Sequence, residues 1–210
     1  MLSKKQLIEI FTRFEVAKET PLIELNYTSP YTLLIAVVLS AQSTDKTVNK
    51  VTLKLFEKNN TPERILELGE ENLKNFIKSI GLYNSKARNI IKLSRMLIEK
   101  FSSTVPDNLK DLQLLPGVGR KSANVILNSI FGKHTIAVDT HVFRVSNRIG
   151  LCKTKNPLET ELALEKIIPD NFKKYAHHWL VLHGRYICKA RKPLCSKCII
   201  NDICTYENKT

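Results

Sequence analysis

Hydrophobic residues recur along most of the chain at the three- to four-residue spacing of amphipathic helices. From Ala123 to Ile130, for example, apolar residues at i, i+3, i+4 and i+7 form one continuous face. Residues 33–39 are apolar on every side and predict a helix buried at the centre of the fold. One stretch, residues 134–138, resembles a strand, but nothing nearby would pair with it. The pattern therefore predicts an all-α fold.

Capping residues indicate where the predicted helices begin. Ser3 is followed three positions later by Gln6, a capping box that precedes an amphipathic stretch ending near Phe14. Ser29 and Pro30 supply an N-cap and a proline at the first helical position, ahead of the apolar stretch. Further helices are expected to begin near Thr44, Thr61, Glu71, Ser85, Pro106, Asp139, Asn156 and Asp170, and helix ends are expected at Gly69, Gly81 and Gly184.

The charge balance narrows the class of partner. The chain has 210 residues, of which 43% are hydrophobic, so it can build a core and disorder is not expected. Its formal net charge of +13 indicates a polyanionic partner, most simply nucleic acid. A generally soluble basic protein would show the same excess, so composition alone leaves both interpretations open.

The apolar runs and the first residues bear on location. The longest run, from Leu33 to Leu39, has the length of a core helix, and we expect no membrane partner. The first residues include Glu9 and Glu15 and show no signal-peptide pattern. We therefore expect a cytoplasmic protein, whose five cysteines would be thiols or metal ligands rather than disulfides.

A glycine-containing stretch, L-P-G-V-G-R-K-S-A-N-V-I-L over residues 115–127, precedes and opens one predicted helix. Gly117, Val118 and Gly119 would form a turn in which glycine permits a positive φ and a close approach to a ligand. The helix N-terminus behind them offers unpaired N–H groups and partial positive charge, which suit a phosphate. Lys121 stands in the first helical turn. The alternative is a packing turn with a solvated lysine beside it.

Four cysteines near the C-terminus follow the spacing C-x6-C-x2-C-x5-C, which predicts convergence on a soft metal or cluster. The spacing by itself leaves structural zinc and a [4Fe–4S] cluster open. The predicted ligands are Cys188, Cys195, Cys198 and Cys204, and Cys152 lies outside the motif without an assigned role.

The loop between the first two of these cysteines, K-A-R-K-P-L, contains no acidic residue. Lys189, Arg191 and Lys192 would therefore form a phosphate-binding surface held by the metal site. A solvated basic loop is the alternative.

Three histidines, His177, His178 and His183, lie just upstream around Trp179. They could be metal ligands, but four cysteines already complete a site. We therefore expect them to pack and form hydrogen bonds on their helix.

A lysine at a DNA-binding hairpin predicts nucleophilic chemistry if its amine is neutral. A lysine of ordinary pKa, about 10.4, is free base in about one molecule in 2,500 at pH 7. Desolvation, the positive end of a helix and the neighbouring Arg120 would all disfavour the ammonium of Lys121. The amine could then attack C1′ of a nucleoside, expel the base and form a Schiff base. Loss of a C2′ proton would break the strand at the 3′ phosphate.

Asp139, in I-A-V-D-T-H-V-F-R-V, is the candidate partner carboxylate. Departure of the base builds oxocarbenium character at the sugar, which an anion stabilises. The alternative is that Asp139 only caps the helix that follows it. The two roles are compatible, because a cap fixes the carboxylate in position.

These motifs closely resemble those of the endonuclease III family, the bifunctional DNA glycosylases and apurinic/apyrimidinic lyases of the helix–hairpin–helix superfamily. The resemblance rests on L-P-G-V-G-R-K-S-A-N, V-D-T-H-V-F-R-V, H-H-W-L-V-L-H-G-R-Y-I-C and the cysteine spacing, and it covers nearly the whole chain. It implies excision of oxidised or ring-damaged pyrimidines from double-stranded DNA by a monomeric, nucleoid-associated bacterial enzyme, with cleavage 3′ to the abasic site. It also implies Lys121 as the Schiff-base lysine, Asp139 as the catalytic aspartate, and a [4Fe–4S] cluster rather than zinc.

The resemblance implies a domain organisation as well. Two helical domains are expected to flank a DNA-binding cleft. One is a six-helix domain over about residues 21–132, with the helix–hairpin–helix motif at about residues 107–131. The other joins residues 1–20 to residues 133–210 and carries the C-terminal cluster loop.

Further positions match family residues that enter or face DNA. Gln42 and Leu82 match residues that fill the duplex when a nucleotide is flipped out, and each lies just past a predicted helix. His141 matches a position facing DNA, and Arg144, which shares a basic stripe with His141 and Arg148, is also predicted to contact DNA. Arg148 could equally have an internal partner.

Two other functions stay open from the sequence. A monofunctional adenine mismatch glycosylase of the same superfamily shares the cluster and the aspartate but lacks a lysine at the Lys121 position. A non-catalytic DNA-binding module would use the hairpin and the cluster as a docking surface. Ser122 and Ser43 stand where relatives are expected to have Thr and Ala, which puts no proposed role in doubt.

Overall fold

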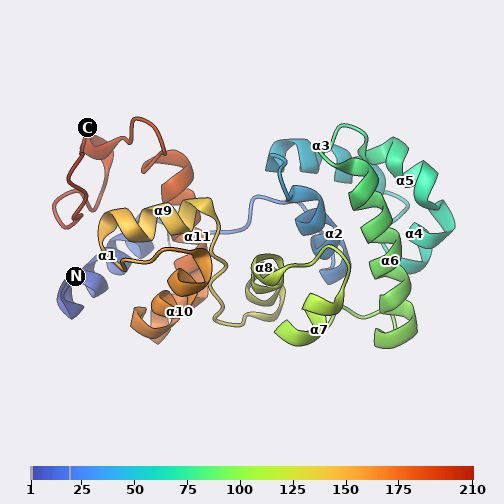
Figure 1. The fold of residues 1–210 in the computed structure, drawn as a ribbon, viewed down its shortest axis with the longest axis horizontal. Helices are drawn as coiled ribbons and strands as arrows, with labels where there is room; N and C mark the ends of the chain where they lie inside the picture. The colour runs from blue at the N-terminus through green and yellow to red at the C-terminus, as the bar shows by residue number, and fades with distance from the viewer. Residues whose placement is uncertain (1, 19) are drawn as a thin grey trace. The chain divides into compact units, whose positions relative to one another are not determined.

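Helices account for all regular structure in the part of the chain that is described. The computed structural model describes residues 2–18 and 20–210, which contain eleven α-helices, one 3₁₀ helix and no β-strand (Figure 1). The strand-like stretch at residues 134–138 is irregular. None of these helices combines the length and the apolar character that crossing a membrane requires. The all-α prediction is confirmed.

The chain divides into two compact units, Glu24–Phe131 and a second unit that joins Met1–Ile23 to Gly132–Thr210. The first unit has seven helices, where the resemblance implied six, because Gly69 separates two short helices. The seven are α2 (Pro30–Ser40), α3 (Asp45–Phe56), α4 (Pro62–Leu68), α5 (Glu70–Ile77), α6 (Tyr83–Phe101), α7 (Leu109–Leu114) and α8 (Arg120–Phe131).

α2 is the central buried helix of the first unit. Every residue of Tyr31–Leu39 is buried, and α2 contacts α3, α6 and α8. Ser29 caps the helix, with Pro30 at its first position, as predicted. The hydroxyls of Tyr31 and Ser94 share a 2.6 Å hydrogen bond between α2 and α6. Two buried polar groups are thereby satisfied inside an otherwise apolar contact.

The second unit is organised around the contact of α9 with α11. Its core joins Phe11, Val145 and Trp179 from three different helices. The Trp179 indole donates to the Lys18 carbonyl at 2.7 Å, which ties the end of the N-terminal helix to α11. The helices of this unit are α1 (Lys4–Ala17), α9 (Thr140–Ile149), α10 (Pro157–Ile167), α11 (Asp170–Tyr186) and the 3₁₀ helix η1 (Cys195–Lys197).

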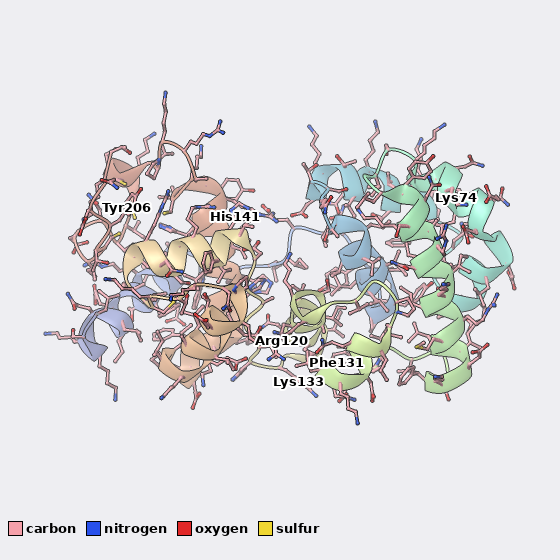
Figure 2. All side chains as sticks on the ribbon, viewed as in Figure 1. Lys74, Arg120, Phe131, Lys133, His141 and Tyr206 are labelled. Atoms are coloured by element: carbon pink, nitrogen blue, oxygen red, sulfur yellow. The ribbon has the colours of Figure 1, made fainter. Side chains whose placement is uncertain are left out.

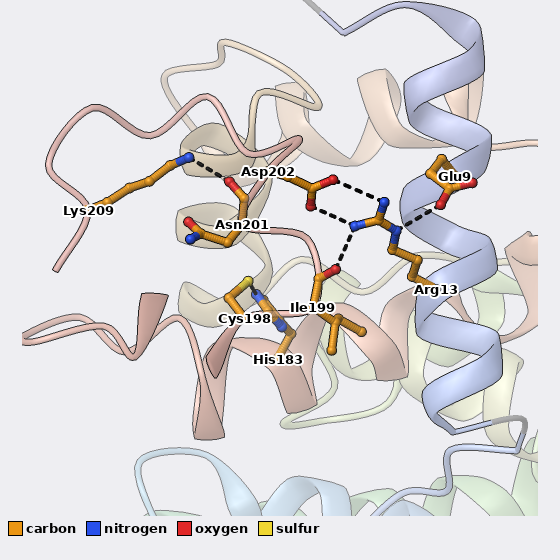
Figure 3. Close-up of polar contacts among 8 residues, drawn as sticks. All are labelled: Glu9, Arg13, His183, Cys198, Ile199, Asn201, Asp202 and Lys209. Carbon is orange, nitrogen blue, oxygen red and sulfur yellow. Dashed lines mark hydrogen bonds and ion pairs between the residues drawn. The ribbon is translucent and has the colours of Figure 1, made fainter. Parts of the chain in front are cut away.

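Arg13 of α1 fastens the N-terminal helix to the cysteine segment (Figure 3). Its guanidinium donates to both carboxylate oxygens of Asp202, at 2.6 and 3.0 Å, and to the Ile199 carbonyl at 2.8 Å. It also pairs with Glu9 at 2.8 Å, and these acceptors raise the pKa of Arg13. The pairs are partly exposed, so they fix geometry more than they stabilise the fold.

The turn between α5 and α6 shortens one predicted helix and lengthens the other. α5 ends at Ile77 rather than Ile80, because the Ile80 N–H bonds the Ile77 carbonyl in a tighter turn. α6 begins at Tyr83 rather than Ser85, directly after Leu82, whose backbone is left-handed. The predicted stop at Gly81 is therefore a turn of its own between two helices.

Two further helix ends differ from the prediction. α7 begins at Leu109 rather than near Pro106, because Asn108 is the cap, and its Oδ1 accepts from the Asp111 N–H at 2.9 Å. α11 continues through Gly184 to Tyr186. Gly184 stays helical because it is packed closely against α9.

Replacing Leu34 by alanine should destabilise the first unit, because this α2 side chain is fully buried. We expect Leu34→Ala to lower the free energy of unfolding by about 2–5 kcal/mol. Leu53→Ala in α3, where the side chain is 68% exposed, should change it by less than about 0.5 kcal/mol. Urea unfolding followed by circular dichroism measures both, and equal losses would contradict the central burial of α2.

Candidate nucleic-acid interface and catalytic site

The hairpin between α7 and α8 holds its two glycines in different environments. Gly117 has φ +86°, and a Cβ there would lie 3.2 Å from Asn89, so the position suits only glycine. A Cβ on Gly119 would meet nothing within 4 Å, so the backbone there is open to a ligand. Val118 is buried, and its N–H donates to the Leu115 carbonyl at 3.0 Å. Its side chain therefore holds the hairpin to the core instead of facing a ligand.

Lys121 lies in the first turn of α8 and is exposed. Figure 2 labels Arg120 and Phe131, which mark the two ends of this helix. The first N–H groups of a helix lack helical partners and carry partial positive charge, so the Lys121 end of α8 suits an anion. The protein does not enclose the Lys121 amine. The desolvation expected from the sequence would therefore have to come from a bound ligand.

Gln42 and Leu82 share an uncommon backbone conformation. Their φ angles are 55° and 59°, in the left-handed region that non-glycine residues rarely adopt. Both residues are exposed, Leu82 by 62%. The two turns adjoin, because a Cβ on Gly81 would lie 3.5 Å from the Gln42 carbonyl oxygen. Two exposed side chains therefore stand on neighbouring turns whose backbone is held in a costly conformation, about 1–3 kcal/mol each.

Asp139 caps α9, which is the role that the capping alternative predicted from the sequence. Its Oδ1 accepts from the N–H groups of His141 and Val142, both at 2.8 Å. The second carboxylate oxygen takes part in neither bond. The side chain is half-buried at the helix start, so the carboxylate is fixed in direction by the backbone.

Arg144, predicted from the sequence as a DNA contact, uses its guanidinium on partners inside the protein. Its guanidinium donates to the carbonyls of Gly184 at 2.8 Å and of Cys188 at 3.1 Å, and contacts His141 Nδ1 at 3.3 Å. His141, labelled in Figure 2, packs on Gly184, where an added Cβ would come within 2.8 Å of the His141 Cβ. Arg144 therefore holds the end of α11 against α9, beside His141.

Arg148 has internal partners, which was one of the two alternatives that the sequence left open for this residue. It donates to the carbonyls of Lys189 at 2.7 Å and Ala190 at 3.0 Å. Its guanidinium lies 4.6 Å from the centre of the Tyr206 ring, a cation–π contact. The sequence analysis gave Tyr206 no role; its place two residues after Cys204 was the only signal.

The basic loop presents its cations to solvent. Lys189, Arg191 and Lys192 are all exposed, while Arg148 holds the loop backbone from inside. Lys192 has φ 49°. Together with Gln42 and Leu82, it is one of five non-glycine residues with positive φ in the described chain. Strained backbone thus coincides with three of the predicted DNA contacts.

The four cysteines of the motif line one small cavity, of about 20 Å³, beside Ile149, Ile187 and Leu194. None of the four forms a disulfide, and all are half-buried. Among the described residues, no three His, Cys, Asp or Glu side chains form a site for a single metal ion, whereas all four thiols border this one cavity. Four convergent thiols in an apolar setting are the donor set that an iron–sulfur cluster requires.

Burial controls protonation around these cysteines. It raises the pKa of the Cys198 and Cys204 thiols, whose protons must leave when a metal binds. It lowers the pKa of His178 and of His183 to about 4, so both imidazoles are neutral at pH 7. The ring centres of His183 and Phe14 lie 5.2 Å apart. His183 Nε2 lies 3.7 Å from Cys198 Sγ (Figure 3). Both histidines are buried, as the packing prediction required, but His178 Nδ1 lacks the hydrogen bond that was also expected.

The site residues are divided between the two units. Gln42, Leu82, the Gly117 hairpin and Lys121 belong to Glu24–Phe131. Asp139, His141, the basic loop and the four cysteines belong to the other unit.

Two parts of the chain match known families. Residues 35–170 match the HhH-GPD superfamily of base excision DNA repair proteins. Residues 188–204 match the iron–sulfur binding domain of endonuclease III. The second match begins at Cys188 and ends at Cys204, the first and last cysteines of the motif.

Bacterial relatives match along their whole length. The chain is 56% identical to endonuclease III of Haemophilus influenzae and 54% identical to that of Escherichia coli K12. Each alignment covers 208 residues, which is 99% of this chain and 99% of the relative.

Solved structures also match over nearly the whole chain. A trapped endonuclease III–DNA covalent intermediate and a non-covalent endonuclease III–DNA complex are each 47% identical in sequence, with TM-scores of 0.91 and 0.92. Each alignment covers 98% of this chain, and 97% and 96% of the other chain. A thermostable thymine-DNA glycosylase, 28% identical, matches with a TM-score of 0.84 over 96% of both chains.

The two hairpin glycines should respond differently to alanine. Gly117→Ala should lower the free energy of unfolding by about 1–2 kcal/mol, because a side chain is disfavoured at positive φ. Gly119→Ala, which meets no protein atom, should change stability by less than about 0.5 kcal/mol yet weaken DNA binding. Thermal unfolding and fluorescence anisotropy with a labelled duplex separate the two effects. Unchanged DNA affinity in Gly119→Ala would contradict a close approach of DNA to this backbone.

Proposed function

Because the chain belongs to the endonuclease III family of HhH-GPD base excision DNA repair proteins, we propose that Lys121 is the nucleophile with which it acts on DNA. The enzyme is a bifunctional DNA glycosylase and apurinic/apyrimidinic lyase. The observation that carries the proposal is the place of Lys121, exposed in the first turn behind the glycine hairpin. A relative 47% identical in sequence was trapped as a covalent intermediate with DNA.

The hairpin would bind the DNA backbone. The open backbone at Gly119 and the start of α8 present N–H groups to a phosphate, which fixes the register of the strand relative to Lys121. Lys189, Arg191 and Lys192 add exposed positive charge on the basic loop. These contacts carry no sequence information, as suits an enzyme that must search all DNA.

Lys121 would then form the covalent bond. Its neutral amine attacks C1′ of the flipped nucleotide, and the damaged base leaves with the electrons of the glycosidic bond. The nitrogen then loses a proton and the C1′–O4′ bond of the sugar ring opens, with O4′ taking a proton. The resulting imine makes the C2′ hydrogen acidic. Loss of that proton expels the 3′ phosphate, and water releases the sugar from the lysine. Because Lys121 is exposed in the free protein, bound DNA must exclude water from the amine.

Asp139 would stabilise the sugar as the base departs. Its carboxylate is fixed by two backbone N–H groups on Oδ1, so no reorganisation is needed when positive charge develops. The oxygen outside these bonds is the one available to the sugar. Preorganisation by the cap thus serves the catalytic role.

Gln42 and Leu82 would fill the space that the flipped nucleotide vacates. Both are exposed on adjoining turns with left-handed backbone, which directs the side chains outward. The Gln42 amide can form hydrogen bonds with the base on the opposite strand that has lost its pairing partner, and the Leu82 side chain can insert between stacked bases.

The enzyme carries a [4Fe–4S] cluster, and we propose Cys188, Cys195, Cys198 and Cys204 as its ligands. When bound, the cluster cross-links four thiolates and so fixes the segment that bears the basic loop. Arg148 and Arg13 hold the same segment from the protein side.

The substrate class follows from the family, and we propose double-stranded DNA containing oxidised or ring-damaged pyrimidines or abasic sites. The enzyme would work as a monomer in the bacterial cytoplasm, on the nucleoid. The bacterial relatives and the strong positive charge support this placement.

Lys121→Ala should abolish covalent trapping by borohydride on duplex DNA with an abasic site, because no other amine is proposed to attack C1′. Binding to a stable abasic-site analogue should stay within about threefold of wild type, since the hairpin backbone makes that contact. Denaturing gels measure trapping, and anisotropy measures binding.

Lys110→Ala is the matched control, an exposed lysine in the neighbouring helix α7. It should trap at the wild-type rate. Trapping that survives in Lys121→Ala, or is absent from wild type, would refute the proposed nucleophile. Absence from wild type would favour a monofunctional glycosylase or a binding module.

Asp139→Asn should separate the capping role from the catalytic role. Asparagine caps helices as well as aspartate, so thermal stability should stay near wild type. Base excision should fall by about 10²–10³-fold, because the negative charge is lost. Asp139→Ala should lose about 1 kcal/mol of stability as well. Single-turnover excision measures the rate. If Asp139→Asn excised the base at the wild-type rate, the catalytic role would be refuted and Asp139 would only cap the helix.

A further inference from the structure

Lys86 is a buried lysine that links α6 to the end of α2. The residue is only 5% exposed. Its Nζ donates to the Leu39 carbonyl at 2.8 Å, to the Ala41 carbonyl at 2.5 Å and to Ser43 Oγ at 3.4 Å. An ammonium has three N–H donors, and here each donor has an acceptor.

The acceptors lie where α2 ends. The last residue of α2 is Ser40, and carbonyls at a helix C-terminus lack helical partners and carry partial negative charge. Lys86 therefore caps α2 from a distant part of the chain. Burial lowers the pKa of Lys86, because desolvation disfavours the charged ammonium.

The same residue contacts both of the turns that carry strained backbone. Its side chain brackets Gln42, through the carbonyl of Ala41 before it and the hydroxyl of Ser43 after it. Its backbone N–H donates to the Leu82 carbonyl at 3.0 Å. The Lys86 side chain thus fastens the Gln42 turn, which adjoins the Leu82 turn at Gly81, while its main chain makes the ordinary first-turn helical bond to Leu82.

We propose that Lys86 is a positioning residue, which holds Gln42 and Leu82 in the protruding conformation that fills the duplex behind a flipped nucleotide. The inference rests on the proposed function, because it assumes that these two side chains enter DNA. Lys86 itself is buried and touches neither substrate nor reacting atoms.

The physical reason is the Ala41 carbonyl. Without the ammonium, this carbonyl would be left unpaired in a part-buried position, and the peptide between Ala41 and Gln42 would rotate toward water. Such a rotation changes the φ of Gln42, which is held at 55°. Because Gly81 adjoins the Gln42 carbonyl, the change would reach the Leu82 turn.

Lys86→Met tests the proposal, because methionine keeps the unbranched shape of the side chain, one atom shorter, and removes its charge and donors. Ser94→Ala is the matched control. Ser94 also joins α6 to α2, through its hydrogen bond to Tyr31, and it is fully buried. The bond to Tyr31 lies in the first turn of α2, at the opposite end from the Gln42 turn.

The direct readout is a duplex with 2-aminopurine opposite a stable abasic-site analogue. Wild type and Ser94→Ala should raise its fluorescence on binding, as inserted side chains unstack the base, and Lys86→Met should give less than about half that rise. Excision of a damaged base should fall about tenfold or more in Lys86→Met. Trapping on a preformed abasic site, which has no base to extrude, should fall by less than about threefold.

A cycle with Leu82→Ala adds a second test. If Lys86 acts through the turns, Lys86→Met should slow excision by less than about threefold once Leu82 is already alanine. Full additivity would overturn the proposal.

The remaining outcomes are also decisive. Equal loss of fluorescence and excision in Lys86→Met and Ser94→Ala would show a general structural role and overturn the proposal. If Lys86→Met does not fold, Lys86→Gln, which keeps an amide donor, is measured in its place. Failure of both to fold would show that the fold, rather than the turns, needs this lysine. Wild type that neither traps nor excises would instead refute the proposed function.

Discussion

The burial of α2 is the constraint on which the hairpin and the two turns depend. α2 is buried along nearly its whole length, and α3, α6 and α8 pack on it. Gln42 follows the end of α2, Leu82 precedes α6, and Lys121 stands in the first turn of α8. Each proposed DNA contact of this unit therefore lies at the end of a helix whose position α2 fixes. Functional residues at the ends of rigid helices suit a site whose reacting groups must be positioned to within a fraction of an ångström.

Three arginines of the second unit hold distant segments together. Arg13, Arg144 and Arg148 donate to carbonyls or carboxylates of other segments, whereas the cations of the basic loop, Lys189, Arg191 and Lys192, are exposed. Guanidinium has five N–H donors in a fixed plane and can bind several acceptors at once, which an ammonium cannot match in geometry. Net charge alone could not separate structural arginines from surface lysines, because both count equally toward +13.

The first turns of α9 and α8 each contribute to the proposed site. The Asp139 carboxylate satisfies two N–H groups of α9 and is thereby held in one direction. At the start of α8 the backbone at Gly119 is open, and this is where we propose that a phosphate binds. One helix start thus fixes a carboxylate, and the other is the proposed binding site for the DNA backbone.

The sequence by itself determined whatever depends on neighbours within a few residues. Caps such as Ser29 and Asp139, the left-handed Gly117 and the cysteine spacing are local, so the all-α fold, the hairpin and the candidate metal ligands followed from them, whereas Gln42 and Leu82 were indicated by the family resemblance. The burial of Val118, the engagement of Arg144 and the Lys86 contacts did not follow. Lys86 and Ala41 are 45 residues apart, and Arg144 and Cys188 are 44 apart. Only the tertiary structure brings such donors and acceptors together, because no local pattern records which distant carbonyl a folded chain will place beside a given side chain.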